Sequence, residues 1–138
     1  EVQTQHQGIC PDGWHVPTGS ESPQGNGEFG TLFANVGGRN NTAGRMLKSK
    51  SGWNGNDSYA FSVLPAGGYD KDINNNEWGF RYLGQASYLW SASEASGDAQ
   101  KQAYPQGFSS SKNSVEQSGL NKIFYCSLRC IKDTDTSN

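Results

Sequence analysis

Two cysteines near opposite ends of the chain constrain the fold more than any other feature of the sequence. Cys10 and Cys130 enclose nearly all of the 138 residues, so a bond between them would close a single domain. Residues 124–131 alternate strictly between two faces, which is the pattern of an extended strand. We therefore predict that 123–131 is the strand that closes the core, and that Cys10 and Cys130 form a disulfide.

The third cysteine, Cys126, lies on the same face of this predicted strand as Cys130. Their separation along a strand is roughly 13 Å, whereas a disulfide requires Cα atoms within about 7 Å. Cys126 is therefore predicted to be a buried core thiol. A disulfide between the other two indicates an oxidising compartment outside the cytoplasm. The alternative is three reduced, buried cysteines that pack as small hydrophobic residues.

Composition restricts the classes of partner. A formal net charge of −2 and scattered Lys and Arg residues argue against nucleic acid and against a charged membrane surface. No apolar stretch approaches the roughly 20 residues of a membrane-spanning helix. The chain has 4 Trp, 6 Tyr and 6 Phe but also 18 Gly, which predicts a core of large aromatic residues held within long loops.

The chain divides into an N-terminal tether (1–9), one domain (10–133) and a C-terminal tail (134–138). Apolar residues at helical spacing predict a helix from Phe29 to Val36, and a second, shorter helix is expected at 42–49.

The helical period disappears after these residues. Short strands are expected at 59–64, 77–83 and 88–93, with one further hairpin within 94–122. Two early helices and a small, twisted, mostly antiparallel sheet with long loops give an α+β domain.

The sequence offers no catalytic constellation. The motifs of α/β-hydrolases, zinc proteases and P-loop enzymes are absent, and His15 has no second histidine at useful spacing, so we expect it to be a structural histidine. Asp70-Lys-Asp72 and Asn74-Asn-Asn-Glu77 could supply oxygen ligands to calcium, but their spacing does not match an EF-hand and is typical of turns. We therefore predict no cofactor, with calcium as the alternative.

Several aromatic residues lie among Gly, Asn and Ser, a mixture found in binding surfaces. They are Trp53, Trp78, Tyr104 and Phe108. The alternative is that these rings form the core that supports the long loops.

Five segments in this order resemble the Fibrobacter succinogenes major paralogous domain, which occurs in secreted and lipid-anchored surface proteins of Bacteroidetes and Fibrobacteres. The resemblance covers about residues 10–133. Its segments are Cys10-Pro-Asp-Gly-Trp-His-Val-Pro-Thr18, Leu47-Lys-Ser-Lys-Ser-Gly-Trp-Asn54, Phe61-Ser-Val-Leu-Pro-Ala-Gly67, Leu89-Trp-Ser-Ala-Ser-Glu94 and Ser127-Leu-Arg-Cys-Ile-Lys-Asp133.

The resemblance implies a C-type-lectin-like fold with adjacent termini, related to formylglycine-generating enzymes and to the variable proteins of diversity-generating retroelements. In some relatives the loops before the last strand bind the ligand, which here corresponds to 94–122. The calcium and sugar motifs of true C-type lectins are absent. The enzyme branch uses a closely spaced pair of cysteines, and here only Cys126 could take that role.

These observations predict a non-catalytic, extracellular ligand-binding or adhesion module of a bacterial surface protein or lipoprotein. Its ligand would be a protein or a glycan, and the domain would be a monomer within a larger protein that does not itself insert into the membrane. The alternatives are a copper-dependent cysteine oxidase of the formylglycine type, with Cys126 as its thiol, and a structural spacer. The predicted ligand-binding residues are Trp78, Glu94, Gln100, Gln102, Tyr104, Gln106, Phe108 and Lys112.

Overall fold

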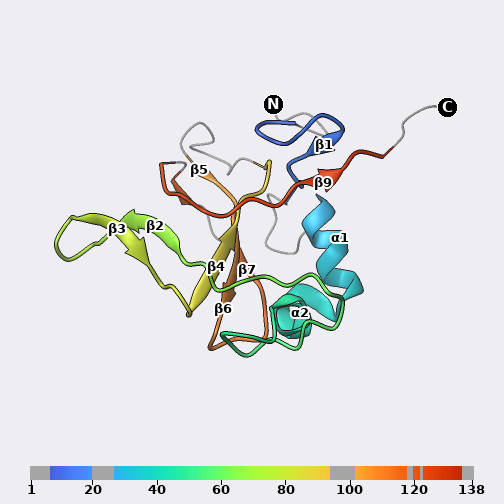
Figure 1. The fold of residues 1–138 in the computed structure, drawn as a ribbon, viewed down its shortest axis with the longest axis horizontal. Helices are drawn as coiled ribbons and strands as arrows, with labels where there is room; N and C mark the ends of the chain where they lie inside the picture. Colours follow the sequence, from blue (N-terminus) through green and yellow to red (C-terminus); the bar gives the residue numbers. More distant parts are fainter. Residues whose placement is uncertain (1–6, 20–26, 94–101, 118–119, 122, 135–138) are drawn as a thin grey trace.

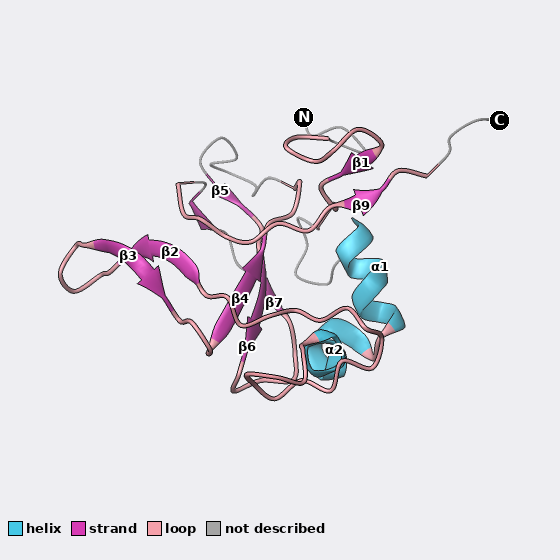
Figure 2. Cartoon of the chain, viewed as in Figure 1, coloured by secondary structure: helices cyan, strands magenta, loops and turns pink. Residues whose placement is uncertain are grey.

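The computed structural model has an α+β architecture in which two short helices pack beside several small antiparallel sheets (Figure 1, Figure 2). Parts of the predicted tether and tail, 1–6 and 135–138, lie outside the residues that the structure describes. The described residues are 7–19, 27–93, 102–117, 120–121 and 123–134.

Both predicted helices are confirmed, although the second is shorter than expected. Helix α1 (Gly27–Asn35) buries Phe29 and Phe33 on the apolar stripe that the sequence indicated. A π-helical turn, η1 (Gly38–Thr42), leads into helix α2 (Ala43–Leu47). Gly37 (φ 101°) lies between α1 and η1 and ends the first helix, because a left-handed backbone favours glycine.

The strands are short and every strand pair within the sheets is antiparallel. They form a β1–β9 pair, a β2–β3 hairpin, a three-stranded sheet in the order β4–β6–β7, and a β5–β8 pair. Their bounds are β1 Trp14–His15, β2 Gly68–Lys71, β3 Trp78–Arg81, β4 Ala86–Leu89, β5 Gln102–Ala103, β6 Gln106–Ser109, β7 Glu116–Gln117, β8 Leu120–Asn121 and β9 Ile131–Lys132.

Two of the predicted strands require correction. The segment 59–64 forms no strand, because Ala60 (φ 55°) and Ser62 (φ 56°) interrupt an extended backbone and leave Val63 with a single parallel bridge to Lys48. The predicted strand at 88–93 corresponds to β4, which begins at Ala86 and ends at Leu89.

The closing segment 123–131 is not one continuous strand. Tyr125 makes an isolated bridge to Tyr69, Ser127 bridges Leu89, and regular pairing resumes only in β9. Each residue pairs with a different element, because the segment passes from the β2–β3 hairpin to the central sheet and then to β1.

The termini are adjacent and covalently linked. The disulfide between Cys10 and Cys130 is present, with a Cα–Cα distance of 5.9 Å, beside the β1–β9 pair. The predicted structural role of His15 is also confirmed. His15 is buried, with Nδ1 2.6 Å from Asp133 Oδ1 and Nε2 2.8 Å from Glu28 Oε2, so it joins both ends of the chain to the start of α1.

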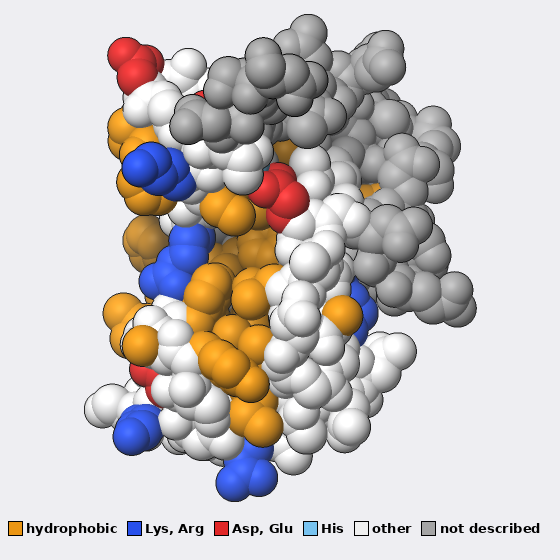
Figure 3. All heavy atoms as spheres, turned by 90° about the vertical axis from the view of Figure 1, so that its right-hand side faces the viewer, with side chains coloured by type: hydrophobic (Ala, Val, Ile, Leu, Met, Phe, Trp, Pro, Cys, Tyr) orange, Lys and Arg blue, Asp and Glu red, His pale blue; other side chains and the backbone are white. Residues whose placement is uncertain are grey.

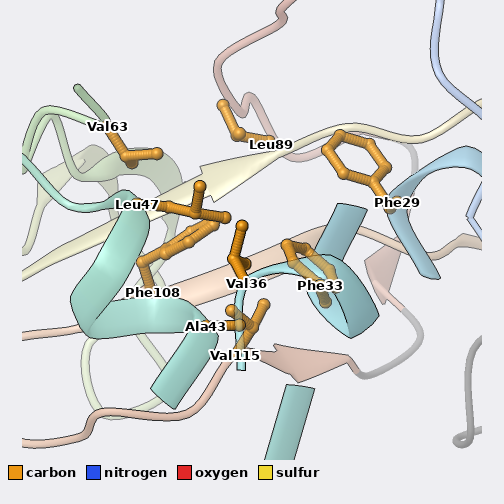
Figure 4. Packing of buried hydrophobic residues seen from close by; sticks show 9 residues of the cluster. All are labelled: Phe29, Phe33, Val36, Ala43, Leu47, Val63, Leu89, Phe108 and Val115. Carbon is orange, nitrogen blue, oxygen red and sulfur yellow. The ribbon is translucent and has the colours of Figure 1, made fainter. Parts of the chain in front are cut away.

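The core lies where the two helices pack against the β4–β6–β7 sheet (Figure 4). Phe33 is central to it, with its ring centroid 5.8 Å from that of Phe29 and 6.3 Å from that of Phe108. The buried cluster consists of Phe29, Phe33, Val36, Ala43, Leu47, Val63, Leu89, Phe108 and Val115. None of the helices in the described part of the chain has the length and apolar character needed to cross a bilayer.

Candidate functional site

The β2–β3 hairpin carries a cluster of aromatic side chains at the surface. Tyr69 lies opposite Phe80 in the ladder, and Trp78 follows at the next position on the same face. Tyr125 bridges Tyr69 on the other edge of β2, which adds its ring to that face. We define the aromatic surface as Tyr69, Trp78, Phe80, Phe124 and Tyr125. Figure 1 shows the hairpin extending away from the helices.

The rings of the aromatic surface contact one another closely. The Tyr69 ring is stacked between Trp78, at 5.9 Å between centroids, and Tyr125, at 5.3 Å, with interplanar angles of 17° and 18°. Phe80 meets Tyr69 edge to face at 4.9 Å, and Trp78 also contacts Phe124. Cross-strand aromatic pairs of this kind stabilise a two-stranded ribbon and hold its side chains rigid.

Three of these rings are nevertheless exposed to solvent, whereas Tyr69 and Phe124 are half-buried. Phe80 is 86% exposed, Tyr125 66% and Trp78 41%. Exposed aromatic residues gathered on one face are uncommon in a monomeric domain and mark sites of interaction. Beside them, a hollow of about 540 Å³ is lined by Lys71, Arg81 and other residues of the hairpin.

The opposite face of the hairpin is ionic. Arg81 Nη1 lies 3.1 Å from Asp72 Oδ2, and Arg81 Nε lies 3.1 Å from Asp70 Oδ1, although this second ion pair lacks the alignment of a hydrogen bond. The backbone N–H of Asn74 donates to Asp72 and lowers the pKa of that carboxyl group, and Arg81 lowers it further. The ionic face thus stabilises the hairpin that presents the aromatic surface.

The predicted ligand-binding residues do not gather in one place. Trp78 belongs to the aromatic surface, Tyr104 is half-buried, and Lys112 is exposed and forms an ion pair with Glu116. Gln102 lies in β5, and its side chain is not described. Glu94 and Gln100 lie outside the described residues.

The prediction that Gln106 and Phe108 face a ligand is corrected by their position. Both side chains are buried, because β6 is the central strand of its sheet and its alternate residues point into the core. Gln106 Nε2 donates to Gln117 Oε1 at 2.9 Å, so a polar residue is accommodated there. This polar residue made a buried strand resemble an exposed loop in the sequence.

The other four members of the aromatic surface were missed as binding residues. A signal was present, because aromatic residues occupy alternate positions after the Asn74-Asn-Asn76 turn, but only the register brings Tyr69 opposite Phe80. The long separation of Tyr125 from the hairpin gave no sequence signal at all.

Cys126 is the free cysteine of the described chain and is half-buried. Burial, together with the negative charge of Asp70, raises the pKa of its thiol to about 12. A thiol with such a pKa is almost fully protonated near neutral pH, and only the thiolate is strongly nucleophilic. The sequence predicts a buried core thiol, but Cys126 is instead half-buried and lies outside the buried hydrophobic cluster, because the closing segment crosses from the hairpin to the central sheet at this point.

Within the described ranges, no group of three or more His, Cys, Asp or Glu side chains is arranged to hold a metal ion. Of the three carboxylates considered for calcium, Asp70, Asp72 and Glu77, the first two are paired with Arg81.

Exposed apolar side chains also occur away from the hairpin. Figure 3 shows the side of the molecule on which the helices lie, and a band of hydrophobic side chains runs down it. Tyr59 and Leu64 are exposed outside the aromatic surface and provide matched comparisons for it.

A family model described as the Fibrobacter succinogenes major domain (Fib_succ_major) matches residues 1–132. The chain belongs to this family. This match agrees with the resemblance that the five sequence segments indicated. Neither the curated proteins nor the solved structures gave a significant match.

Proposed function

We propose that this domain is a non-catalytic recognition module that binds another macromolecule through the aromatic surface. The supporting observation is that Trp78, Phe80 and Tyr125 are exposed while their rings are held in place by mutual stacking. Rigid aromatic side chains lose little conformational entropy on binding and supply large contact areas. The binding face thus moves from loops 94–122 to the hairpin, and of the predicted residues it keeps Trp78.

A protein surface fits this site better than a glycan does. The Tyr69 ring already stacks on its neighbours Trp78 and Tyr125, which leaves less of it free for a sugar ring to lie on. The exposed Phe80 and Tyr125 offer aromatic rings and a tyrosine hydroxyl. Such mixed aromatic patches are enriched in protein–protein hot spots.

The setting of the proposed module is the outside of a bacterial cell. The Cys10–Cys130 disulfide supports an oxidising compartment, as expected for a secreted or lipid-anchored surface protein. The paired terminal strands, two helices and small sheets are compatible with the C-type-lectin-like fold that the family resemblance implied, and we retain that fold as part of the proposal.

The raised pKa of Cys126 and the commitment of Cys130 to a disulfide both argue against the alternative of a cysteine oxidase. An oxidase of that type needs a thiolate and a second nearby thiol. A purely structural spacer would show no binding in the experiment below.

The test is to measure binding of the purified domain to arrays of extracellular host proteins and of glycans, and then to compare variants on every positive spot. Trp78→Ala and Phe80→Ala are each expected to weaken binding about 30-fold or more, because hot-spot aromatics cost about 2 kcal/mol or more when truncated. Tyr59→Ala is the matched control, since Tyr59 is a similarly exposed aromatic outside the site and should leave binding unchanged.

Binding that survives both hairpin substitutions would show that the aromatic surface is not the site. Binding to glycans alone would replace the protein partner, and absence of any binding across both arrays would favour the spacer.

A further inference from the structure

The outer edge of the β2–β3 hairpin is an unpaired strand whose sequence is complementary to itself. We propose that two copies of this domain associate through antiparallel pairing of their β3 strands, forming a continuous four-stranded sheet. This inference concerns the edge of the hairpin rather than the ligand of its aromatic face, and it stands independently of the proposed function.

The hydrogen bonds of β2 fix which residues of β3 face the open edge. Tyr69 exchanges both backbone hydrogen bonds with Tyr125, so its N–H and C=O point away from β3. Asp72 N donates to Glu77 O at 2.9 Å, which makes that pair a hydrogen-bonded one. Because such pairs alternate along an antiparallel ladder, Gly79 bonds inward, whereas Trp78 and Phe80 direct their N–H and C=O outward.

No described residue accepts or donates a hydrogen bond at these outward groups of Trp78 and Phe80. An open edge of this kind is a template for another strand. The hairpin extends from the body of the molecule (Figure 1), so a second chain can reach the edge.

The sequence Glu77-Trp-Gly-Phe-Arg81 determines a register when it is paired with a copy of itself. Placing Gly79 on the two-fold axis puts Trp78 opposite Phe80 of the second copy, and this is the pair whose backbone groups face outward. The same register puts Glu77 opposite Arg81, so the ionic faces are complementary as well. A register centred on Phe80 would lose both matches.

Glycine at the axis is itself consistent with this arrangement. The two Gly79 residues would form a non-hydrogen-bonded pair, in which Cα atoms approach to about 4.5 Å. A Cβ atom at position 79 would meet no atom closer than Arg81 Nη2, at 4.0 Å. The fold of a single chain therefore does not require glycine at this position.

The consequence is a doubled aromatic surface. Trp78 and Phe80 of the two copies lie on the same side of the four-stranded sheet, so dimerisation would leave that face open and make it bivalent.

The interface is small, so the expected affinity is weak, with a dissociation constant of roughly 10 µM to 1 mM. The proposal replaces the sequence-based expectation of a monomer, and the following experiments decide between them.

The decisive test is disulfide cross-linking of the full chain carrying Cys126→Ser together with Gly79→Cys. The Cα atoms of the two introduced cysteines would be about 4.5 Å apart, within the 4.4–6.8 Å that a disulfide spans. Mild oxidation should therefore give a covalent dimer. Leu83→Cys in the same background is the control, because Leu83 is 78% exposed but does not meet itself in this register. We expect a yield at least about fivefold higher for Gly79→Cys; equal yields would overturn the proposal.

Sedimentation velocity on Phe80→Pro and Phe80→Thr separates edge pairing from contact between aromatic faces. Proline removes the N–H that residue 80 directs outward, and it breaks no hydrogen bond to β2. Threonine removes the aromatic ring but keeps this N–H. We expect a concentration-dependent dimer for the unmodified chain, a weaker one for Phe80→Thr, and none for Phe80→Pro. A monomer at every concentration, or equal loss in both variants, would contradict pairing through this edge.

Discussion

His15 joins the first strand, the first helix and the C-terminal segment through two carboxylates, those of Glu28 and Asp133. Burial alone lowers the pKa of its imidazole, but hydrogen bonds to Glu28 and then to Asp133 outweigh burial, so the pKa lies above its usual 6.5. The folded protein therefore binds a proton at His15 more tightly than the unfolded chain does. This contribution to stability is fully present below about pH 6.5 and is lost as the pH rises through the folded pKa.

The corresponding prediction is that the melting temperature falls as the pH is raised from below 6.5 into the alkaline range. His15→Gln should lower the free energy of unfolding by about 1–3 kcal/mol at low pH, because two partly buried carboxylates lose a charged donor. It should also remove this part of the pH dependence. Thermal unfolding of both proteins across the pH range is the measurement, and parallel pH profiles would show that His15 does not titrate as described.

The burial of Lys48 depends on its tertiary contacts and not on its neighbours in the sequence. Its side chain is fully buried, and Nζ donates to Asn54 Oδ1 and to the backbone carbonyls of Ser109 and Lys112. Burial lowers the pKa of Lys48 to about 8. In the sequence it lies beside Lys50 in a run of polar residues, which gives no reason to place it in the core.

The attachment of the hairpin to the body depends on Gly67, at the entry to β2. Its backbone is in the left-handed region, at φ 67°, and its N–H donates to Ala86 O at 2.7 Å. A Cβ atom there would lie 2.2 Å from Arg81 O, at the end of β3. β2, β3 and β4 come together at Gly67, and only glycine permits so close an approach of the backbones.

Gly67→Ala is therefore expected to destabilise the domain by about 2–4 kcal/mol, from left-handed strain plus the clash with backbone. Gly84→Ala is the matched control, because Gly84 has φ 79° but open space around its Cα. That substitution should cost only about 1–2 kcal/mol. Urea unfolding of the two variants makes the comparison, and equal losses would mean that the contact with Arg81 has no cost.

The whole molecule is closed by the disulfide between Cys10 and Cys130, which are separated by 120 residues. Closing so long a loop restricts the unfolded chain strongly. In the described residues, the β1–β9 pair and the His15 contacts also hold the two ends together. We expect Cys10→Ser with Cys130→Ser to lower the free energy of unfolding by about 2–5 kcal/mol. The measurement is urea unfolding in a Cys126→Ser background, which prevents thiol exchange.

Thiol counting gives an independent check at the same scale. The unmodified protein should react at one thiol after denaturation without reductant, and that thiol, Cys126, should react slowly while the protein is folded. Three reactive thiols in the denatured chain would contradict the disulfide.

The sequence by itself determined the family, the α+β class, the disulfide, both helices and β3, because these follow from local periodicity and from well-spaced motifs. The tertiary structure alone decided which aromatic residues are core and which are surface. Trp78 and Phe108 lie in similar sequence surroundings, yet β3 is an exposed edge and β6 a central strand. Burial of a strand residue depends on what covers its sheet, and here the covering helices and the distant Tyr125 are brought into place only by folding.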